Sequence, residues 1–483
     1  MTRVLILNPP SIYTKNVVRD LIYGCWCKGK RIGGANSPPI NLLYVASVLK
    51  QEGHNVTFLD ALGEQKTIDE ICTVSTKNDV IIISTSTMSF AEDTHILSEI
   101  KKVNPSVITI IFGSHPTFMP ENSLKPDSVD IIIRREPEFI IRDVIDALEK
   151  NRDSWKLIQG IGYKENLNII LNDFYPLIQN LDELPFLMRE LLPRNVDYFN
   201  PLVKKIPYTT IMTSRGCPAR CNFCTVPYFY GNKIRSRSAE NILAELKQIQ
   251  QQGYKEVWFR DETFTTYKKR NIEICNGMLE RGITLSWICN ARVDTLDREM
   301  LILMKKAGCH MIKFGVESGV QEILDNLSKG IKIEQTRQIF QLTHDIGIDT
   351  HAHIMLGCPG ETNHTIKETI NFVKQINPTT VTFGICTPYP GTDLFKEVAK
   401  THPDIADGTT CDLAKIHEKS FFNEYFTQIS SDDLSKWVTK AYFSYYFRIS
   451  YVLRTLQRIR SYDELKRIIL AGTNVFQFSL GQD

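Results

Sequence analysis

Short apolar runs alternate with helical patterns along the first 148 residues, and this alternation constrains the fold more than any other feature. Five runs have the length and composition of buried strands, and apolar residues recur at helical spacing between several of them. Such alternation predicts an α/β domain whose parallel sheet is covered on both faces. The expected strands are Val4–Leu7, Val56–Leu59, Val80–Ser84, Val107–Phe112 and Val129–Ile133, and the expected helices are Asn41–Gln51, Glu92–Val103 and Phe139–Leu148.

A second series of the same kind runs from residue 207 to about residue 400 and contains six strand–helix units. Six units are too few for an eight-fold barrel. In any parallel sheet of this type, functional residues are expected at the carboxyl ends of the strands. The strands are expected at Thr209–Thr213, Glu256–Arg260, Thr284–Cys289, Met311–Val316, Thr350–Leu356 and Val381–Cys386, and the helices at Ser238–Gln252, Tyr267–Arg281, Asp297–Lys306, Glu334–Ile346, Thr362–Ile376 and Asp393–Ala399.

Three cysteines lie in the loop after the first of these six strands. Cys217, Cys221 and Cys224 have the spacing C-x-x-x-C-x-x-C. Thiolates suit iron–sulfur clusters or zinc, but structural zinc sites close with four ligands, usually as two separated pairs. Three close thiols therefore favour a cubane cluster that keeps one iron open for a substrate or cofactor. The alternative is a chance group of small apolar residues, since nine other cysteines lie elsewhere in the chain.

The spacing and context of this loop resemble the radical S-adenosylmethionine superfamily. The resemblance implies a partial (β/α)6 barrel over residues 207–400, a 4Fe–4S cluster held by the three cysteines, and S-adenosylmethionine on the open iron. Phe223, between the last two cysteines, is then expected beside this cofactor. One electron from a donor such as flavodoxin or ferredoxin would cleave S-adenosylmethionine to a 5′-deoxyadenosyl radical.

Three other strand ends carry further candidate residues. Asp261 and Glu262 stand where many relatives have Gly-Gly-Glu, so only a backbone role toward the methionine amine carries over. Arg292 could pair bidentately with the methionine carboxylate, and a structural arginine is the alternative. Glu317 and Ser318 end the fourth strand. The carboxylate of Glu317 can accept both hydroxyls of the adenosyl ribose; otherwise a buried glutamate here needs a basic neighbour.

The last two strands end in loops rich in glycine and proline. The fifth ends in Gly357-Cys358-Pro359-Gly360-Glu361, which resembles the superfamily's adenine-contact motif, so Gly357 and Pro359 are expected at the adenine. Tyr389, in the loop after the sixth strand, is expected to face the substrate.

The order of loops in the first domain resembles a Rossmann-like cobalamin-binding domain. Many corrinoid proteins carry Asp-x-His-x-x-Gly after the first strand, where this chain has Asn8-Pro9-Pro10-Ser11. Either cobalamin binds without a histidine from the protein, or the domain has lost the cofactor. His115 could be a ligand or only a hydrogen-bonding residue. The residues expected at cobalamin are Asn8, Pro9, Ser84, Thr85, Gly113, Ser114 and His115.

Three remaining segments complete the expected organisation. Residues 149–206 predict a linker with a small hairpin over Gly160–Asn172. Residues 11–40, with Cys25 and Cys27, form a long connection of the kind that is often functional. Residues 401–483 predict a small α-helical region that begins after the capping residue Ser430. We interpret its dense aromatic residues as a helical core rather than a substrate lid or a membrane-binding surface.

Composition constrains the partners and the cellular compartment to be expected for this protein. The net charge of +2 gives no reason to expect nucleic acid as a partner. Twelve cysteines without a secretory signal are typical of a reduced, cytoplasmic protein. No apolar run approaches the ~20 residues that a transmembrane helix needs.

The combined expectation is a cobalamin-dependent radical enzyme that methylates an unactivated carbon or phosphorus centre of a small-molecule biosynthetic intermediate through the radical and methylcobalamin. A radical cyclase, as in tetrapyrrole ring formation, is the alternative reaction. A non-catalytic electron-transfer or sensing protein is the alternative class, and it predicts no pocket for S-adenosylmethionine.

Overall fold

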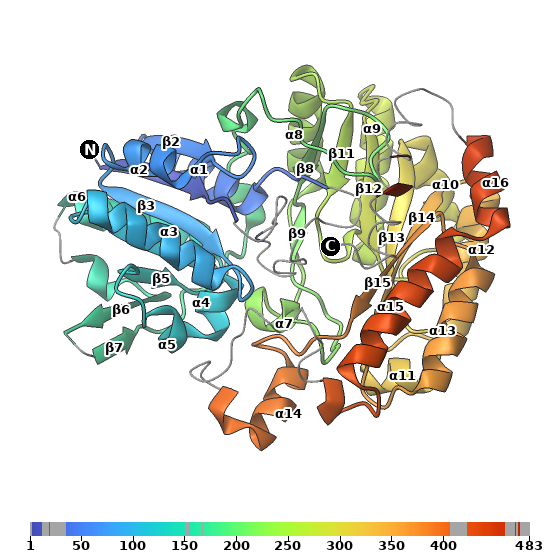
Figure 1. The fold of residues 1–483 in the computed structure, drawn as a ribbon. Helices are drawn as coiled ribbons and strands as arrows, with labels where there is room; N and C mark the ends of the chain where they lie inside the picture. Colours follow the sequence, from blue (N-terminus) through green and yellow to red (C-terminus); the bar gives the residue numbers. More distant parts are fainter. Residues whose placement is uncertain are drawn as a thin grey trace.

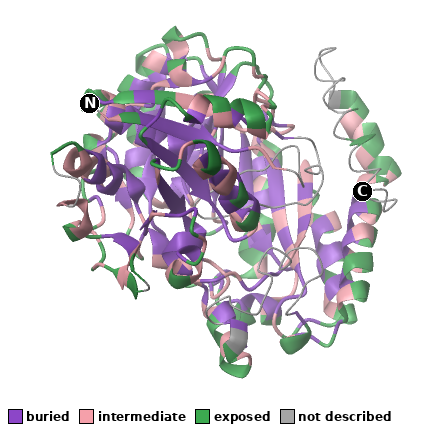
Figure 2. Cartoon of the chain, turned by 60° about the vertical axis from the view of Figure 1, so that its left-hand side comes forward, coloured by how far each residue is buried: buried purple, intermediate pink, exposed green. Residues whose placement is uncertain are grey.

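The computed structural model describes residues 2–11, 19, 35–150, 154–166, 168–405, 423–458, 469, 472 and 473. They form two α/β units side by side, one on a seven-stranded sheet and one on a six-stranded sheet (Figure 1). Most strands of both units are buried, and exposed residues gather mainly on the outer helices (Figure 2). The expected fold class is confirmed. Cys25 and Cys27 of the long connection lie outside the described residues.

The first sheet has the strand order β2-β1-β3-β4-β5-β6-β7. Its first five strands run parallel, as expected. The hairpin β6–β7, which the sequence analysis assigned to a linker, pairs antiparallel with β5 and extends this sheet. The strands are β1 (Arg3–Asn8), β2 (Asn55–Asp60), β3 (Val80–Thr85), β4 (Ile108–Gly113), β5 (Ile131–Ile133), β6 (Ile161–Glu165) and β7 (Asn168–Leu171).

Helices cover both faces of this sheet because successive strand residues point to opposite sides. Val4 and Ile6 pack with α1 and α6, whereas Leu5 and Leu7 pack with α2 and α3. The sequence analysis missed the eight-residue α2, although Thr67 and Glu70 form a capping box at its start. The helices are α1 (Ile40–Gln51), α2 (Ile68–Ser75), α3 (Phe90–Val103), α4 (Ser114–Phe118), α5 (Pro120–Ser123) and α6 (Pro137–Lys150).

Helix α1 is buried on all sides because two layers enclose it. Leu42 and Val45 face the first sheet, while Leu43 and Val48 pack against apolar residues of segment 178–192. A helix that is apolar all round is a buried helix. The segment expected to be a plain linker therefore fills the space between the two units.

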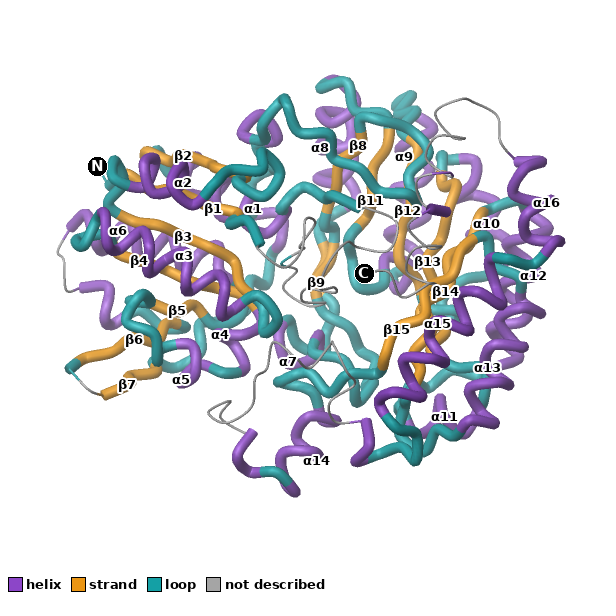
Figure 3. Tube along the Cα trace, in the orientation of Figure 1, coloured by secondary structure: helices purple, strands orange, loops and turns teal. Residues whose placement is uncertain are grey.

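The second sheet has the order β15-β14-β13-β12-β11-β8, and all six strands run parallel. The six expected strands are confirmed, and helices lie along the outer side of the curved sheet (Figure 3). The strands are β8 (Tyr208–Ile211), β11 (Glu256–Phe259), β12 (Ser286–Ala291), β13 (Cys309–Glu317), β14 (Asp349–Leu356) and β15 (Thr380–Ile385), and the helices are α8 (Ala239–Gln251), α9 (Lys268–Glu280), α10 (Arg298–Lys306), α11 (Gln321–Asn326), α12 (Ile333–Ile346) and α13 (Asn363–Ile376).

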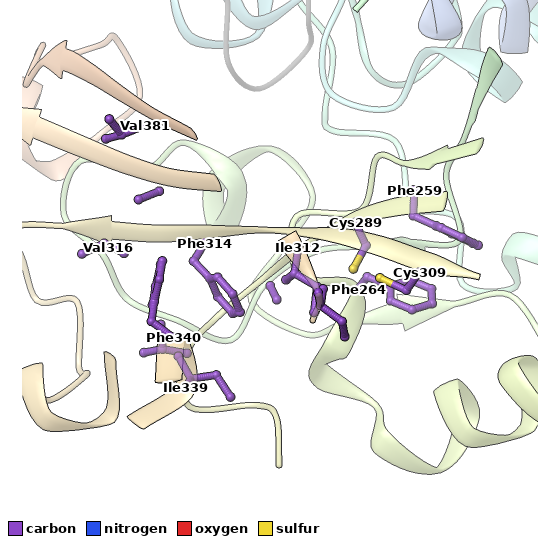
Figure 4. Close-up of a cluster of buried hydrophobic side chains, with 14 of the residues drawn as sticks. Phe259, Phe264, Cys289, Cys309, Ile312, Phe314, Val316, Ile339, Phe340 and Val381 are labelled. Atoms are coloured by element: carbon purple, nitrogen blue, oxygen red, sulfur yellow. The ribbon is translucent and has the colours of Figure 1, made fainter. Parts of the chain in front are cut away.

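One apolar core joins the outer face of this sheet to its helices. Phe259, Phe264 and Phe314 are fully buried in it, and the thiols of Cys289 and Cys309 approach one another there (Figure 4). These cysteines serve packing, which is the common role of a buried free thiol.

The C-terminal region contributes to the same core. Helix α15 (Ser431–Tyr446) lies along β15, and the hydroxyl of Tyr446 accepts the amide of Val381 at 2.8 Å. The core interpretation is confirmed for Tyr445 and Tyr446, and so is the cap by Ser430. It is wrong for Tyr425, which is exposed.

Helix α14 (Asp393–Thr401), expected as the sixth helix of the barrel, bridges the two units. Leu394 packs with Cys358 and Cys386 of the barrel, while Phe395 and Val398 pack against Met119 of the first unit. No helix in the described ranges is long and apolar enough to cross a membrane.

A buried network of charges joins the two units. Arg215 lies in β9 (Ser214–Arg215), which pairs with β10 (Arg235–Ser236). Its guanidinium pairs with Glu136 at 3.0 Å and with Glu138 at 2.5 Å, both at the start of α6. Arg235 pairs with the other oxygen of Glu136 at 2.9 Å. Every one of these side chains is less than a tenth exposed.

We expect Arg215→Met to lower the free energy of unfolding by about 3–5 kcal/mol, because removal of one partner leaves buried carboxylates unpaired. Urea denaturation measures the loss. Arg281→Met is the matched control, since Arg281 pairs with Glu240 at the surface and such pairs stabilise little. Equal losses in the two variants would contradict a joining role for the network.

Candidate cluster and cofactor site

The cysteine loop runs from β9 to the short helix α7 (Val226–Phe229) and is held at both ends. Gly216 has φ +94°, and a Cβ atom there would lie 2.3 Å from the carbonyl oxygen of Lys233, so only glycine fits without a shift. The amide of Cys217 donates to the carbonyl of Gly231. Phe229, at the end of α7, packs into the core of the first unit. The loop therefore lies at the boundary of the two units.

The three thiols of this loop lie close enough to act on one another's ionisation. Cys217 and Cys221 are buried and Cys224 is half-buried. Burial raises the pKa of the Cys217 thiol and raises the pKa of Cys224 to about 12, and the other thiols add to both shifts. The positive charges of Arg292 and Lys329 act in the opposite direction.

This donor set fits a cubane cluster better than a single ion. Among the described residues, no group of three or more His, Cys, Asp or Glu is arranged around one metal ion. In a cluster each thiolate binds a different iron, so the ligands need not converge on one point. Three thiols beside two cations suit a thiolate-bound anionic cluster. The expected ligands are thus brought together in one loop.

Asparagine side chains tie the cysteine loop to the neighbouring loops. Asn222 donates to the carbonyl of Asn326 at 2.8 Å, and Asn326 donates to the carbonyl of Pro359 at 3.0 Å. Phe223 packs on the apolar cluster that contains Cys358, and its ring centroid is 5.8 Å from Nζ of Lys329. The cysteine loop and the Gly357–Glu361 turn therefore share one wall.

Asp261 anchors the start of the cysteine loop. Its fully buried carboxylate accepts the amide of Thr213 at 2.6 Å and the hydroxyl of Ser214 at 2.6 Å, and its carbonyl accepts Nδ2 of Asn290. The structure thus adds a side-chain role to the expected backbone role. Glu262 follows, and its charge contributes to the raised pKa of Cys217, after the larger effect of burial.

Arg292 faces the cysteine loop, but a carboxylate already occupies its bidentate side. Nε and Nη2 donate to the two carboxylate oxygens of Asp294 at 2.9 and 2.8 Å, and Nη2 also meets the carbonyl of Lys329. The predicted pairing with the methionine carboxylate must therefore compete with Asp294.

Glu317 has the basic neighbour that the sequence analysis called for but did not identify. Nζ of Lys329 donates to Oε1 of Glu317 at 2.7 Å, and both side chains are buried. Oε2 makes no hydrogen bond within the described part of the chain. Glu317 has φ +63° at a bulge between β13 and β14, which turns its side chain out of the regular strand direction. Ser318, in contrast, bonds to Thr369 and to the amide of Val320 inside the protein.

The turn after β14 is closed by its own glutamate. Oε2 of Glu361 accepts the amides of Gly357 and Cys358 at 2.5 and 3.0 Å. Asn423, from the C-terminal region, donates to the carbonyls of Gly357 and Cys386 at 2.7 Å each and so joins the ends of β14 and β15. Sequence reasoning missed Asn423 because no local pattern marks it. Tyr389 accepts from Thr392 through its carbonyl, at the start of α14.

The carboxyl edge of the first sheet carries the residues expected at cobalamin. Asn8 donates to Asp60 at 2.7 Å. The carbonyl of Pro9 accepts from Arg19 at 2.6 Å. A Cβ atom on Gly113 would lie 2.1 Å from the carbonyl of Thr85, so glycine is required where these two strand ends meet. Ser114 begins α4 directly after Gly113.

Both ring nitrogens of His115 are engaged within the protein. Nδ1 lies 3.3 Å from the hydroxyl of Thr87 and Nε2 lies 2.9 Å from Oδ1 of Asn122, while the ring of Phe90 packs at a tilt against the imidazole. Burial lowers the pKa of His115 to about 4. The surroundings support the hydrogen-bonding interpretation over the ligand interpretation.

A cavity lies between the carboxyl edge of the first sheet and the barrel. Asn8 and Ser84 line it from the first unit, and Thr210 and Arg260 line it from the second. The hydroxyl of Ser84 is buried without a hydrogen-bond partner in the described residues. A buried polar group of this kind calls for a ligand or water, so this hydroxyl is available to a polar group of a bound cofactor.

Comparisons with known proteins agree with this architecture. Residues 33–145 match the B12 binding domain and residues 211–373 match the Radical SAM superfamily. The chain is 34% identical over 436 residues to an uncharacterized methyltransferase of Pyrococcus horikoshii, covering 88% of this chain and 92% of that protein. It is 30% identical over 384 residues to the anaerobic magnesium-protoporphyrin IX monomethyl ester cyclase of Rubrivivax gelatinosus, covering 77% and 68%.

A solved structure supports the fold. The cobalamin-dependent S-adenosylmethionine radical enzyme OxsB, with aqua-cobalamin bound, aligns with a TM-score of 0.72 at 18% identity, covering 99% of this chain and 72% of that one. Fold and site together define a two-domain enzyme with a corrinoid domain ahead of a radical cluster domain. The chain belongs to the B12-binding radical S-adenosylmethionine enzyme family, as the cysteine loop and the order of loops in the first domain together predicted.

Glu361 should make the free energy of unfolding of the protein depend on pH. Burial raises its pKa from the ordinary 4.5 to about 7, so the folded protein favours the protonated acid. The associated stability is present below pH 4.5 and is lost as the pH rises toward 7. At 1.36 kcal/mol per pKa unit the change is roughly 3 kcal/mol.

Unfolding curves of the parent and Glu361→Gln between pH 4.5 and 7.5 test this expectation. The amide cannot titrate, so the difference in unfolding free energy between parent and variant should shift steadily in favour of the variant with rising pH. Parallel pH profiles would mean that Glu361 does not titrate as its burial requires.

Proposed function

We propose that this protein is a radical S-adenosylmethionine methyltransferase that transfers a methyl group to an unactivated carbon or phosphorus centre of a small-molecule biosynthetic intermediate. The observation that carries the proposal is the ion-pair link between the cysteine loop and the first unit, whose sheet carries at its carboxyl edge the residues expected at cobalamin. Arg215, two residues before Cys217, pairs with Glu136 and Glu138 of the first unit. The 34% identity to a methyltransferase supports methyl transfer as the reaction.

The cofactors supply the reactive chemistry when bound: the cluster provides one electron for cleavage of S-adenosylmethionine, and cobalamin carries the methyl group. The protein's own task is to position them. We assign Cys217, Cys221 and Cys224 to the cluster. Glu317, oriented by Lys329, is assigned to the ribose, because Oε1 meets Nζ and Oε2 remains for a hydroxyl donor.

Other residues of the site shape its walls. The Gly357–Glu361 turn presents backbone toward the adenine, and Glu361 fixes that backbone through two amide hydrogen bonds. Asn8 and Ser84 line the cavity on the corrinoid side. A small electron-transfer protein such as flavodoxin or ferredoxin would supply the reducing electron.

Radical cyclisation is the second candidate reaction. It is favoured by the 30% identity to an anaerobic magnesium-protoporphyrin IX monomethyl ester cyclase. The two reactions share the cysteine loop and differ in what becomes of the methyl group of S-adenosylmethionine. Product analysis therefore separates them.

We expect Cys217→Ala to abolish 5′-deoxyadenosine formation in protein reconstituted anaerobically with iron, sulfide and hydroxocobalamin. Loss of one thiol removes a cluster ligand, while the fold around the loop is held by other contacts. Chromatography of the quenched reaction measures the nucleoside. Cys72→Ala, on α2 of the first unit, is the control and should retain parent activity; formation at the parent rate in Cys217→Ala would refute the assignment.

Methyl-labelled S-adenosylmethionine tests the reaction type. Incubated with the small-molecule fraction of a cell extract, a methyltransferase should form S-adenosylhomocysteine together with 5′-deoxyadenosine and place label in a product. Deoxyadenosine without S-adenosylhomocysteine or labelled product would favour the cyclase and contradict methyl transfer.

A further inference from the structure

One imidazole of the second unit faces the lumen, the space on the inner side of the curved six-stranded sheet. His353 lies on β14 between Ala352 and Ile354, whose side chains belong to the helix-packed core outside the sheet. Successive strand residues point to opposite faces, so His353 points into the lumen. Its Nδ1 lies 3.0 Å from the hydroxyl of Thr382, whereas its Nε2 makes no hydrogen bond within the described part of the chain. The side chain is half-buried, so this nitrogen is accessible to a bound molecule.

A line of hydrogen bonds fixes the orientation of this imidazole. The hydroxyl of Thr382 also lies 3.3 Å from Nε2 of His351, and Nδ1 of His351 lies 2.7 Å from the hydroxyl of Thr380. The two imidazole rings meet edge to face, with their centroids 4.5 Å apart. A hydroxyl carries one hydrogen, so Thr382 donates to at most one of the two imidazoles. The proton of His353 can therefore lie on either ring nitrogen, and Nε2 can act as a donor or as an acceptor.

The imidazole of His353 is uncharged. Burial, reinforced by the charges of His351, Lys313 and Lys329, lowers its pKa well below the ordinary value. A neutral imidazole forms a hydrogen bond through Nε2 but brings no charge to its partner. It therefore suits a hydroxyl or a carbonyl oxygen better than a carboxylate or a phosphoryl group.

Glycines keep the lumen open around His353. Its register partners are Gly315 on β13 and Thr382 on β15, and Gly384 follows two residues after Thr382. A Cβ atom on Gly384 would have one described atom within 4 Å, the carbonyl oxygen of Ile354 at 3.9 Å. Both glycines are half-exposed. The inner surface beside the imidazole therefore has room for a ligand.

The same position adjoins the residue assigned to the ribose. A Cβ atom on Gly315 would lie 2.5 Å from Oε1 of Glu317 and 2.8 Å from Nζ of Lys329. The buried pair of Glu317 and Lys329 thus lies directly over Gly315. Because Gly315 and His353 are paired in register, the imidazole lies one strand away from this pair. A molecule in the lumen that meets His353 is therefore close to the adenosyl group that Glu317 is assigned to hold.

We propose that Nε2 of His353 forms a hydrogen bond with an uncharged polar group, a hydroxyl or a carbonyl, of the small molecule on which this enzyme acts. The inference rests on the proposed function in placing the adenosyl group at Glu317 and the substrate in the lumen. It deepens that function by naming a residue that binds the substrate and the chemistry of the group it binds. This hydrogen bond determines which atom of the substrate faces the adenosyl radical.

Deuterium transfer into 5′-deoxyadenosine tests the proposal in the reconstituted full-length protein. The probe is the small-molecule fraction of cells that make this protein, grown in heavy water, so that its compounds carry deuterium on carbon. Unlabelled S-adenosylmethionine and a reductant are then added. A correctly positioned substrate gives its deuterium atom to the radical, and mass spectrometry of the nucleoside measures the deuterated fraction. The parent should form deuterated 5′-deoxyadenosine.

Two substitutions separate the roles of the two ring nitrogens. In His353→Asn the amide reaches the position of Nδ1 and can keep the bond to Thr382, but nothing replaces Nε2. In His353→Gln the amide reaches the position of Nε2. We expect His353→Asn to lower the deuterated fraction about tenfold, the effect of one hydrogen bond, while total 5′-deoxyadenosine stays within about twofold of the parent. His353→Gln should retain most of the deuterium transfer.

His344→Asn is the matched control, because His344 lies exposed on α12 outside the lumen; it should behave as the parent does. Thr382→Val provides a further variant if His353→Asn does not fold, since it removes the hydroxyl that orients the imidazole, and it should lower deuterium transfer in the same direction.

Equal deuterium transfer by the parent and His353→Asn overturns the proposal. Retention in His353→Asn with loss in His353→Gln also overturns it, because His353 would then serve only the bond to Thr382. Absence of deuterium from the nucleoside that the parent forms overturns it as well, since no substrate in the lumen then meets the radical. The readout follows hydrogen and not methyl, so its failure leaves the methyl-transfer test untouched. A cyclase, in contrast, would fail the methyl-transfer test and still transfer deuterium.

Discussion

The buried ion pairs of Arg215 and Arg235 with Glu136 and Glu138 are the interaction on which the rest of the site depends. Burial of four charged side chains is costly unless each finds partners in good geometry. Here the partners come from different units: the arginines flank the cysteine loop and the glutamates begin α6, next to the first sheet. The network is satisfied only when the two units meet in this one arrangement.

The arrangement has direct consequences for the chemistry. It brings the carboxyl edges of two parallel sheets toward one another, and this is the edge at which both kinds of sheet bind ligands. The asparagine links from Asn222 through Asn326 to Pro359 then fix the cysteine loop against the Gly357–Glu361 turn. Asp261 fixes the start of the loop from the other side. The position of the cysteine loop is therefore set by buried contacts within the protein and not by bound cofactors alone.

Much of the fold could be predicted from the sequence because it follows from patterns within short segments of the chain. All eleven expected strands of the two parallel sheets appear, since each is a short apolar run with its own flanking turn. The cysteine loop was equally visible, because its three cysteines lie within eight residues. The hairpin β6–β7 was recognised as a hairpin, but its place in the first sheet depends on β5, some thirty residues earlier.

Contacts between distant segments could not be predicted. Lys329 meets Glu317 from the loop after α11, and Asn423 reaches Gly357 across 66 positions of the chain. Asp261 was singled out for its place in a sequence motif, yet its carboxylate accepts hydrogen bonds from Thr213 and Ser214, which lie some fifty residues earlier at the start of the cysteine loop. The contacts of Lys313 and Arg260 with the ring of Trp258 were missed for the same reason, since these three residues form a group only after the strands are in register.

The central claim is that cluster and cobalamin share one site between the two units. Electron paramagnetic resonance of the doubly reconstituted protein tests it most directly, with the cluster reduced and cobalamin held as cobalt(II), so that both centres carry an unpaired electron. The account predicts retention of both cofactors after desalting and signals broadened by mutual spin interaction, relative to protein that carries either cofactor alone. A spectrum equal to the sum of the two separate signals, or loss of the corrinoid on desalting, would contradict it.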